Sequence, residues 1–265
     1  MSDEPSNKDE KEQEEQLAEG TLLSHLMELR TRLVKISIAV IGVFVLLLPF
    51  SQKIFVVASK PLVDVLPGQK MIATAVTSPL LTPFKLTFFV ALFVAMPIIL
   101  YQVWAFVAPG LYRKEKRFAF PLLGSSIVLF YAGIAFAYFV VFELVFGFFA
   151  SVTPQSVEMM TDIAAYLDFI TKIFLAFGLA FEVPVATVLI VWTGLTTPEK
   201  LGKARPYVFL SAFVIGMFLT PPDVISQTLL AVPVYLLYEL GIIMSRIFSR
   251  DRRRDAAKAA TEDAN

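Results

Sequence analysis

The chain has 265 residues, and its 23 Lys and Arg balance 23 Asp and Glu, so its formal net charge is zero. Hydrophobic residues make up 57% and charged residues only 17%, whereas soluble domains average about 45–50% apolar and about 25% charged residues. The charges are clustered between long apolar stretches, which is typical of an integral membrane protein. Because the net charge is zero, the chain offers no global attraction for nucleic acid.

The residue types that carry most metal and redox chemistry are nearly missing from the sequence. There is no cysteine and only one histidine, His25. This excludes disulfides and thiolate chemistry, and we expect no metal site. A G-x-x-x-x-G-K-[ST] motif for nucleotide phosphates is also missing, so we expect no nucleotide cofactor. Any work that the protein does must therefore draw its energy from elsewhere.

The chain begins with an acidic segment. Eight acidic residues lie between positions 3 and 19, against only Lys8 and Lys11. Such a segment cannot bury enough apolar area to fold, so residues 1–20 are predicted to form a disordered, solvated tail. The segment also lacks the basic start and apolar stretch of a cleavable signal peptide.

Six apolar segments follow, and we interpret each as a transmembrane helix. A span needs about 20 apolar residues to cross a hydrocarbon core of about 30 Å. Pro97 predicts a kink in the second segment, and Pro184 and Pro233 lie inside the fourth and sixth. The third segment is longer than the bilayer is thick, so one end should project or tilt. The predicted spans are 33–50, 83–108, 118–150, 163–192, 206–219 and 224–244.

Basic residues gather in alternate connections between these segments. Positively charged loops remain on the cytoplasmic side, so both termini are predicted to be cytoplasmic. The sequence thus predicts an all-α membrane protein with a six-helix domain over 21–248 and a basic cytoplasmic tail over 249–265. The residues that set this orientation are Arg30, Arg32, Lys35, Arg113, Lys114, Lys116, Arg117, Lys200, Lys203, Arg205, Arg246, Arg250, Arg252, Arg253, Arg254 and Lys258.

The stretch before the first span places an acid, Glu28, among the bases Arg30 and Arg32. Apolar residues at helical spacing predict a helix that starts near Thr21 and lies along the membrane interface before turning inward. Glu28 and Arg32 are four residues apart, so they could form a solvated pair worth about 0.2–0.5 kcal/mol. Alternatively, Glu28 is a surface acid that awaits a cationic partner, and both interpretations stay open.

A second acid, Glu115, lies between Lys114 and Lys116 in the basic connection after the second span. By itself it could simply reduce the charge of that cluster. Two acids within basic segments on one face are nevertheless candidate sites for arginine, because a guanidinium binds a carboxylate through two hydrogen bonds and lysine cannot replace it there without loss.

Glu182 lies deep in the apolar fourth segment. An ionisable group at that depth costs a few kcal/mol or more and is a functional hypothesis by default. The nearby Pro184 frees a backbone carbonyl, so polar groups or water are expected close by. The alternative is a neutral, hydrogen-bonded glutamic acid that holds helices together.

The last two spans form an unusually short hairpin. The apolar part of the fifth span is about 20 Å long as a helix. Pro221 and Pro222, with Asp223, form the structural turn and prevent the helix from extending through it. Thr220 and Gln227 therefore lie near a polar turn at shallow depth and need partners.

Several ordered motifs resemble the TatC family, the receptor core of the bacterial twin-arginine protein translocase. The resemblance covers about residues 21–248. The motifs are "HLMELRTRL", "MIATAVTSPLLTPFKL", "ILYQVWAFVAPGLYRKEKR", "FGLAFEVPV" and "RPYVFLSAFVIGMFLTPPDVISQTLLA".

This resemblance implies a concave bundle in the bacterial cytoplasmic membrane that exports folded precursor proteins and performs no covalent chemistry. Transport would use the proton-motive force. Glu28 and Glu115 match the family's acids that recognise the twin arginines of signal peptides, and the neighbouring Arg30 is assigned to the same site. Glu182 matches its intramembrane glutamate. TatA and TatB would dock at Met217, Thr220 and Gln227, and the receptor would associate with itself and with lipid.

One departure and two rival functions accompany this interpretation. Glu143 stands where a family proline is expected, which affects only the outer end of the third helix. A proton-coupled secondary transporter that uses Glu182 is the alternative function, although the two halves show no inverted repeat. A purely structural membrane scaffold is a second rival, but it would not need Glu182 within the membrane.

Overall fold

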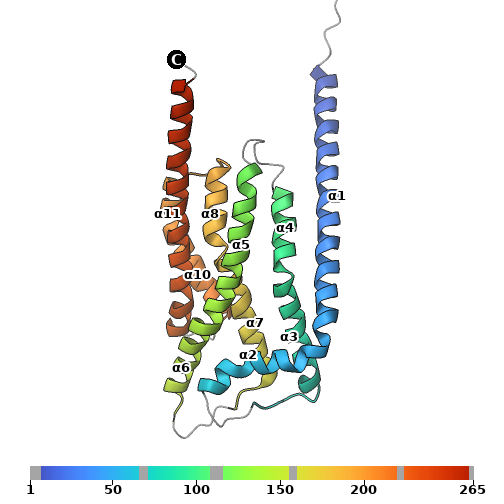
Figure 1. The fold of residues 1–265 in the computed structure, drawn as a ribbon, viewed down its shortest axis with the longest axis vertical. Helices are drawn as coiled ribbons and strands as arrows, with labels where there is room; N and C mark the ends of the chain where they lie inside the picture. The colour runs from blue at the N-terminus through green and yellow to red at the C-terminus, as the bar shows by residue number, and fades with distance from the viewer. Residues whose placement is uncertain (1–6, 66–70, 108–115, 155–159, 220–223, 263–265) are drawn as a thin grey trace, which may run out of the picture.

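The molecule is a bundle of helices, and a computed structural model provides its coordinates. Figure 1 shows α1 (Asn7–Leu47) and α11 (Val224–Glu262) extending beyond the bundle at one end, while α2 (Ser51–Val65) lies across the other. Within the described residues there is no strand, only an isolated bridge between Ile72 and Asp162. The structure describes residues 7–65, 71–107, 116–154, 160–219 and 224–262.

The first helix is longer and straighter than the sequence suggested. α1 runs without interruption from Asn7 to Leu47, so residues 7–20 are helical where a disordered tail was expected, and the expected turn before the first apolar run is not seen. No proline occurs within it. Its acidic part is rich in Glu, Gln, Lys and Ala, which are good helix formers, so a helix nucleated in the apolar part can propagate through it.

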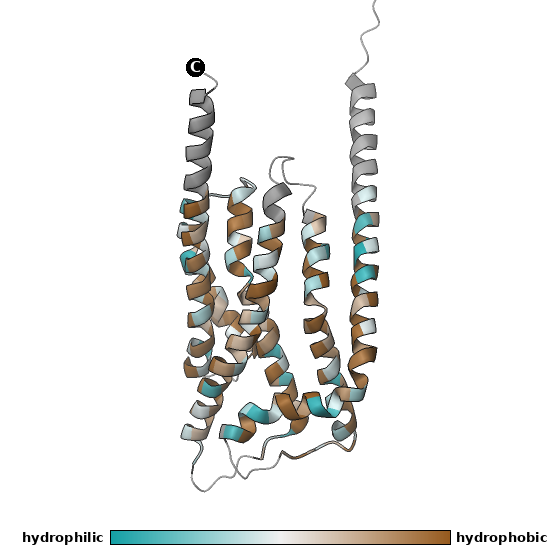
Figure 2. Cartoon of the chain, in the orientation of Figure 1, coloured by the Kyte–Doolittle hydropathy of each residue, from teal (hydrophilic) through white to brown (hydrophobic). Residues whose placement is uncertain are grey.

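Four helical runs are long and apolar enough to cross a membrane, and α3 (Ser78–Val94) with α4 (Met96–Val107) makes a fifth. The α3–α4 pair bends by 49°, and the predicted kink at Pro97 is confirmed, because proline lacks the N–H that a continuous helix needs. Figure 2 shows the apolar residues along these helices. The four runs are Leu26–Asp64, Phe120–Val152, Ile163–Trp192 and Val224–Phe248.

The expected fifth segment is present and short. α10 (Arg205–Leu219) has 15 residues, a length of about 22 Å as an α-helix, against a hydrocarbon core of about 30 Å. A further helix of six residues, α9 (Pro198–Lys203), precedes it and was not expected from the sequence. The Thr197 side chain caps α9 by accepting from the Lys200 amide.

The third and fourth segments are each interrupted once. A π-helical turn, η3 (Ala137–Val141), joins α5 (Lys116–Phe136) to α6 (Phe142–Val152). Glu143 is exposed in the first turn of α6, and the chain is helical there. Having Glu143 in place of the expected family proline therefore leaves this helix continuous. The fourth segment consists of α7 (Ile163–Ala180) and α8, which are described next.

α8 (Val183–Trp192) begins after a break at Phe181 and Glu182, and Pro184 is the second residue of α8. Proline tolerates this position because the first helical N–H groups have no partner in the helix. α8 packs closely on α11, where a Cβ on Gly241 would lie 3.0 Å from the Pro184 Cα. The break therefore places Glu182 at the junction of α7 and α8.

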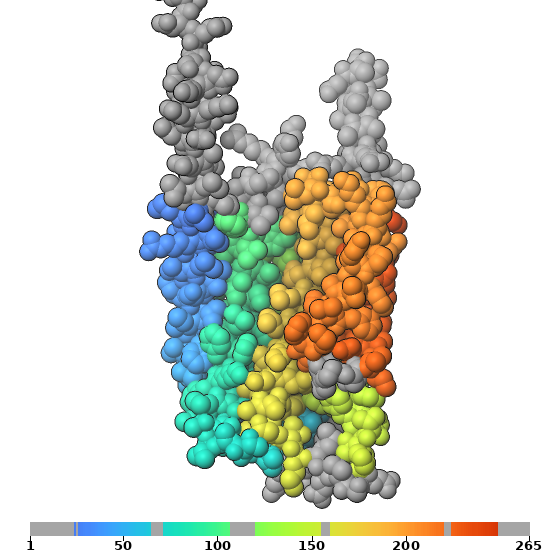
Figure 3. Space-filling view, turned by 180° about the vertical axis from the view of Figure 1, so that it is seen from behind, coloured from blue at the N-terminus to red at the C-terminus, as the bar shows by residue number. Residues whose placement is uncertain are grey.

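The core is aromatic and lies where α5, α6 and α7 meet. Phe130, Phe142 and Phe177 are almost completely buried, and Phe142 contacts Phe174 edge to face with ring centroids 5.0 Å apart. α5 and α7 approach each other at Gly133, where a Cβ would lie 2.5 Å from the Phe177 carbonyl oxygen. Figure 3 shows α7 between the α3–α4 pair and the α10 side of the bundle.

The end of the bundle opposite the termini is closed by α2, which the sequence did not reveal. The Tyr166 hydroxyl donates to the Ala58 carbonyl at 2.8 Å, and Leu62 is buried against the core. Lys53 and Asp64 interrupt the apolar pattern of this segment, which hides it from a search for spans. α2 lies across the end of the bundle, at a steep angle to the other helices (Figure 1).

Asp162 joins two parts of the chain at this same end. Its carboxylate caps α7 by accepting from the Ala164 and Ala165 amides at 2.9 and 3.0 Å. It also accepts from the Thr74 amide and hydroxyl at 3.0 and 2.7 Å. These hydrogen bonds favour the ionised form and lower the pKa of Asp162 to about 2.

The close approach of α5 and α7 predicts that Gly133→Ala lowers stability by about 1–3 kcal/mol, because the added methyl group meets backbone that cannot move aside. Gly124→Ala is the control on the same helix, since nothing lies within 4 Å of a Cβ there. The variants are heated in detergent, and size-exclusion chromatography measures the temperature at which half of the protein remains monodisperse. Equal temperatures for Gly133→Ala and Gly124→Ala would contradict the close packing.

The low pKa of Asp162 predicts a pH-dependent contribution to stability. The folded value of about 2 lies below the ordinary value, which is about 3.9 for an unfolded chain. The ionised group therefore stabilises the fold above about pH 4, and this stabilisation is lost as the pH falls towards 2. Unfolding midpoints of the parent and Asp162→Ala, followed by circular dichroism, should differ at pH 5–7 and converge in acid. The exposed acid Asp64 provides the control Asp64→Ala, and a pH-independent difference for Asp162→Ala would refute the assignment.

Candidate functional site

Glu28 and Arg32 form the ion pair that their spacing suggested. The Arg32 Nε and Nη2 atoms donate to the same carboxylate oxygen, Glu28 Oε1, at 3.0 and 2.5 Å. The Glu28 side chain is 36% exposed and that of Arg32 is 19% exposed. The pair is thus more buried than the fully solvated one that spacing alone allowed.

Arg32 also connects α1 to α4. Its Nη1 atom donates to the Gln102 side-chain oxygen at 3.1 Å, and Nη2 donates to the Ala105 carbonyl at 3.0 Å. Gln102 is buried, with 8% of its surface exposed. The sequence did not reveal these contacts, because Arg32 and Gln102 are 70 positions apart and periodicity detects only neighbours on one helix.

Glu115 lies outside the described residues, but its place in the chain is informative. α4 ends at Val107 and α5 begins at Lys116, so the connection that carries Glu115 starts just beyond Ala105, which Arg32 contacts. Through Arg32, Glu28 therefore lies near the described end of α4, which leads into that connection.

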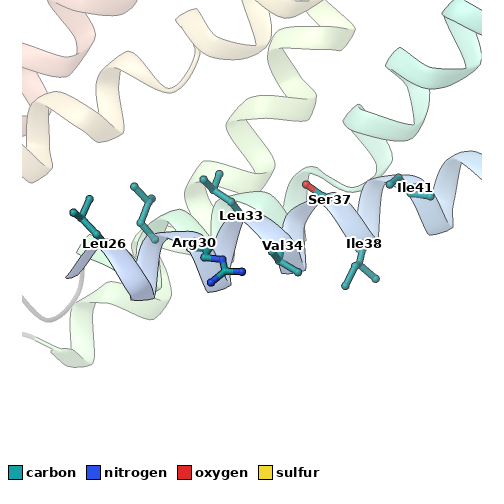
Figure 4. Close-up of a pocket in the computed structure, with 8 residues that line it drawn as sticks. Leu26, Arg30, Leu33, Val34, Ser37, Ile38 and Ile41 are labelled. Atoms are coloured by element: carbon teal, nitrogen blue, oxygen red, sulfur yellow. The ribbon is translucent and has the colours of Figure 1, made fainter. Parts of the chain in front are cut away.

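Arg30 lies on the open side of α1. It is exposed and lines a shallow hollow of about 400 Å³ formed entirely by residues of this helix. Figure 4 shows Arg30 on the same side of the helix as Val34 and Ile38, while Leu33 and Ser37 point to the other side. The run that contains α1 is the least buried of the four long apolar runs, with 6% of its most apolar window buried.

Glu182 is half-buried at the break between α7 and α8. The Ser126 hydroxyl of α5 lies within hydrogen-bonding reach of its carboxyl group, and Ser126 also accepts from the Trp104 indole N–H at 3.3 Å. Glu182 Oε1 is buried and has no hydrogen-bond partner among the described residues. A buried acceptor without a partner costs about 1–3 kcal/mol, so polar contacts beyond this chain would be favourable there.

Of the predicted docking and turn residues of the α10–α11 hairpin, the structure describes two, Met217 and Gln227. Met217 of α10 is 49% exposed, and Gln227 of α11 is half-buried. The backbone of Gly216 packs on Gln227, with a Cβ position 3.7 Å from the Gln227 Cα, so Met217 and Gln227 lie at the same end of the hairpin. Four further predicted residues, Thr220, Pro221, Pro222 and Asp223, lie outside the described residues.

Sequence reasoning missed an ion pair at the other end of the hairpin. Arg205 donates from Nε and Nη2 to the two oxygens of Glu239 at 2.5 and 2.8 Å, and the Tyr235 hydroxyl donates to Glu239 at 3.0 Å. Arg205 and Glu239 lie at similar distances along the chain from the turn at 220–223. Equal spacing from a tight turn brings residues of two antiparallel helices together, and this signal could have revealed the pair.

A family model described as Sec-independent protein translocase protein (TatC) matches residues 24–233. The chain belongs to the TatC family. A TatC protein of Azotobacter chroococcum is 56% identical over 240 residues, covering 90% of this chain and 93% of the relative. The Escherichia coli K12 TatC protein is 56% identical over 236 residues, covering 88% and 92%.

Solved TatC structures agree with this assignment. A crystal structure of a twin arginine translocase receptor, TatC, superposes with a TM-score of 0.77 at 36% identity, covering 84% of this chain and 98% of the other. The resemblance seen in the motifs is therefore confirmed. This TatC family member is a membrane-embedded component of the Sec-independent protein translocase. The family assignment supports the translocase interpretation over the alternative of a secondary transporter.

Proposed function

We propose that this protein is the receptor for twin-arginine signal peptides and the core of a translocase that exports folded proteins across the bacterial cytoplasmic membrane. The single observation that carries the proposal is the half-exposed carboxylate of Glu28, held by Arg32 beside the connection that contains Glu115. The solved relatives are described as twin arginine translocase receptors. The chain contains no nucleotide motif, so the proton-motive force is the proposed source of energy.

Recognition by these acids depends on local geometry. The segments around Glu28 and Glu115 are basic, so long-range attraction does not favour a cationic peptide there. Carboxylates can still select arginine, because a guanidinium fits a carboxylate through two parallel hydrogen bonds. Glu28, Glu115 and Arg30 form the proposed signal-peptide site, with Arg30 on the open face of α1 beside it.

The proposed topology has six crossings with both termini in the cytoplasm. The basic connections, the acidic tail over 1–20 and the basic tail over 249–265 all belong to one face in this arrangement. α10 supplies the fifth crossing along the chain despite its short length, with the bilayer thinned or the turn covered by protein. The membrane domain over 21–248 then forms a concave bundle, and precursor proteins approach the face that bears Glu28.

The proposed docking site for TatA and TatB is the outer part of the α10–α11 hairpin. Val214, Met217 and Phe218 expose apolar side chains along α10, and Thr220 and Gln227 offer polar groups near the turn. A short helix leaves these polar groups at membrane depth, where a partner helix with a polar residue can satisfy them. Self-association of receptors and contact with lipid complete the proposed set of partners.

Glu182 is proposed to line a wet groove inside the bundle. Its carboxyl group has one oxygen without a partner among the described residues and lies next to a helix break. Ionisable groups within membranes usually face a water-filled cavity or the bundle interior. In this position Glu182 can offer a hydrogen bond to a peptide or helix that enters the groove.

Glu28→Ala or Glu115→Ala should each abolish or strongly weaken binding of a precursor while the protein still inserts. Removing one partner of a desolvated charge pair costs about 2–5 kcal/mol, and Glu28→Asp should retain part of the binding. Site-specific crosslinking to a twin-arginine signal peptide measures this. Glu143→Ala removes an exposed acid of α6 and is the control. Normal crosslinking in both alanine variants would exclude these acids as the recognition site.

Gln227→Leu should weaken association with TatA or TatB and leave recognition of the arginine pair intact, because it removes a polar group from the proposed docking surface. Photocrosslinking from positions 217, 220 and 227 tests the surface, with the exposed position 152 on α6 as control. Failure to obtain TatA or TatB adducts from the hairpin positions would rule out this site.

Glu182→Ala should impair export more than it impairs initial binding of the precursor. Glu182→Gln should have a milder effect, because it keeps hydrogen bonding.

A further inference from the structure

The arginine that holds Glu28 has more contacts than a simple ion pair requires. We infer that Arg32 is a positioning residue: anchored on α4 by Gln102 and Ala105, it fixes the Glu28 carboxylate and so sets the preference for arginine over lysine in the bound peptide. This inference rests on the proposed function of Glu28, and it adds the element that gives that acid its selectivity.

Arg32 is fixed independently of Glu28. Two of its four hydrogen bonds go to α4, one to the buried Gln102 side chain and one to the Ala105 carbonyl. Its side chain is only 19% exposed. A guanidinium bonded at these two places on a neighbouring helix keeps its plane, because its donors form a rigid fork. Arg32 therefore serves as a fixed support for the Glu28 carboxylate and does not need to move away when a ligand binds.

The contact with Glu28 leaves part of that carboxylate for a ligand. Both Arg32 donors reach Oε1, so Arg32 does not engage Oε2. Glu28 is the more exposed partner at 36%. An incoming guanidinium can use Oε2, and the orientation of the carboxylate plane is already set by the bonds at Oε1. An unrestrained glutamate on a helix surface would instead sample several rotamers.

A fixed carboxylate distinguishes arginine from lysine by geometry. Arginine presents planar, forked donors, whereas lysine presents a compact ammonium that accepts many orientations. Fixing Glu28 therefore helps a guanidinium more than it helps an ammonium. Arg32 also neutralises part of the charge of Glu28, which reduces nonspecific attraction of any cation and leaves geometry as the main source of preference.

The test compares dissociation constants for two fluorescent signal peptides, one with twin arginines and one with twin lysines. The sample is membrane vesicles that contain the full-length protein with its Tat partners. Arg32→Lys keeps the charge but loses the fork, so the preference for arginine should fall about tenfold, mostly through weaker binding of the arginine peptide. Gln102→Leu leaves the Arg32–Glu28 pair but removes one anchor, so a smaller fall of about threefold is expected.

Arg205→Lys is the matched control, because Arg205 also pairs with a glutamate, Glu239, but in the α10–α11 hairpin. This variant should prefer the arginine peptide over the lysine peptide as strongly as the parent does. If Arg32→Lys and Gln102→Leu weaken both peptides equally and leave their ratio unchanged, Arg32 is only structural and the inference is wrong. Glu28→Ala separates the two levels. If Glu28→Ala leaves binding of the arginine peptide unaltered, the proposed function fails. If Glu28→Ala reduces this binding but the ratio of the two dissociation constants is unchanged in Arg32→Lys and Gln102→Leu, only the positioning role is overturned.

Discussion

The structure depends on one constraint, which is that backbone and charged groups inside a bilayer must find partners within the protein. Two of the helix breaks illustrate this constraint. At the break between α3 and α4, the Tyr131 hydroxyl donates to the Phe93 carbonyl at 3.1 Å. At the break between α7 and α8, Ser126 lies within reach of Glu182. Breaks are tolerated in lipid only where neighbouring helices supply such groups, so their positions determine which helices must be adjacent.

The same constraint explains where the close packing lies. α5 is the neighbour of both α4 and α7, and it packs on α7 through Gly133 with almost no space between the backbones. A larger residue at that position would separate α5 from α7 and move Ser126 away from Glu182. The aromatic core around this contact, which includes Phe130 and Phe177, keeps the two helices in register. The polar site inside the membrane is thus held by apolar packing.

Much of the architecture could be predicted from the sequence, and the exceptions have physical causes. Apolar runs and prolines revealed the long helices, the kink at Pro97 and the short fifth segment, because these features depend on residues close together in the chain. α2 was missed because its charged residues interrupt the apolar pattern. A helix that lies across the bundle does not need an uninterrupted apolar sequence. The contact of Arg32 with Gln102 joins distant segments, and a single sequence carries no local sign of such a pairing.

The two candidate polar sites, one at the membrane surface and one inside the bundle, are connected through α4. Arg32 bonds to Gln102 and Ala105 of α4, and Trp104, which lies between them in the chain, donates to Ser126 of α5. Ser126 in turn lies beside Glu182. A rotation of α4 relative to α1 would break the bonds of Arg32, and a rotation relative to α5 would break the bond of Trp104. Both sets of bonds lie within four consecutive residues, Gln102 to Ala105, so a shift of α4 that changed its contacts near Glu28 would also change its contacts near Glu182.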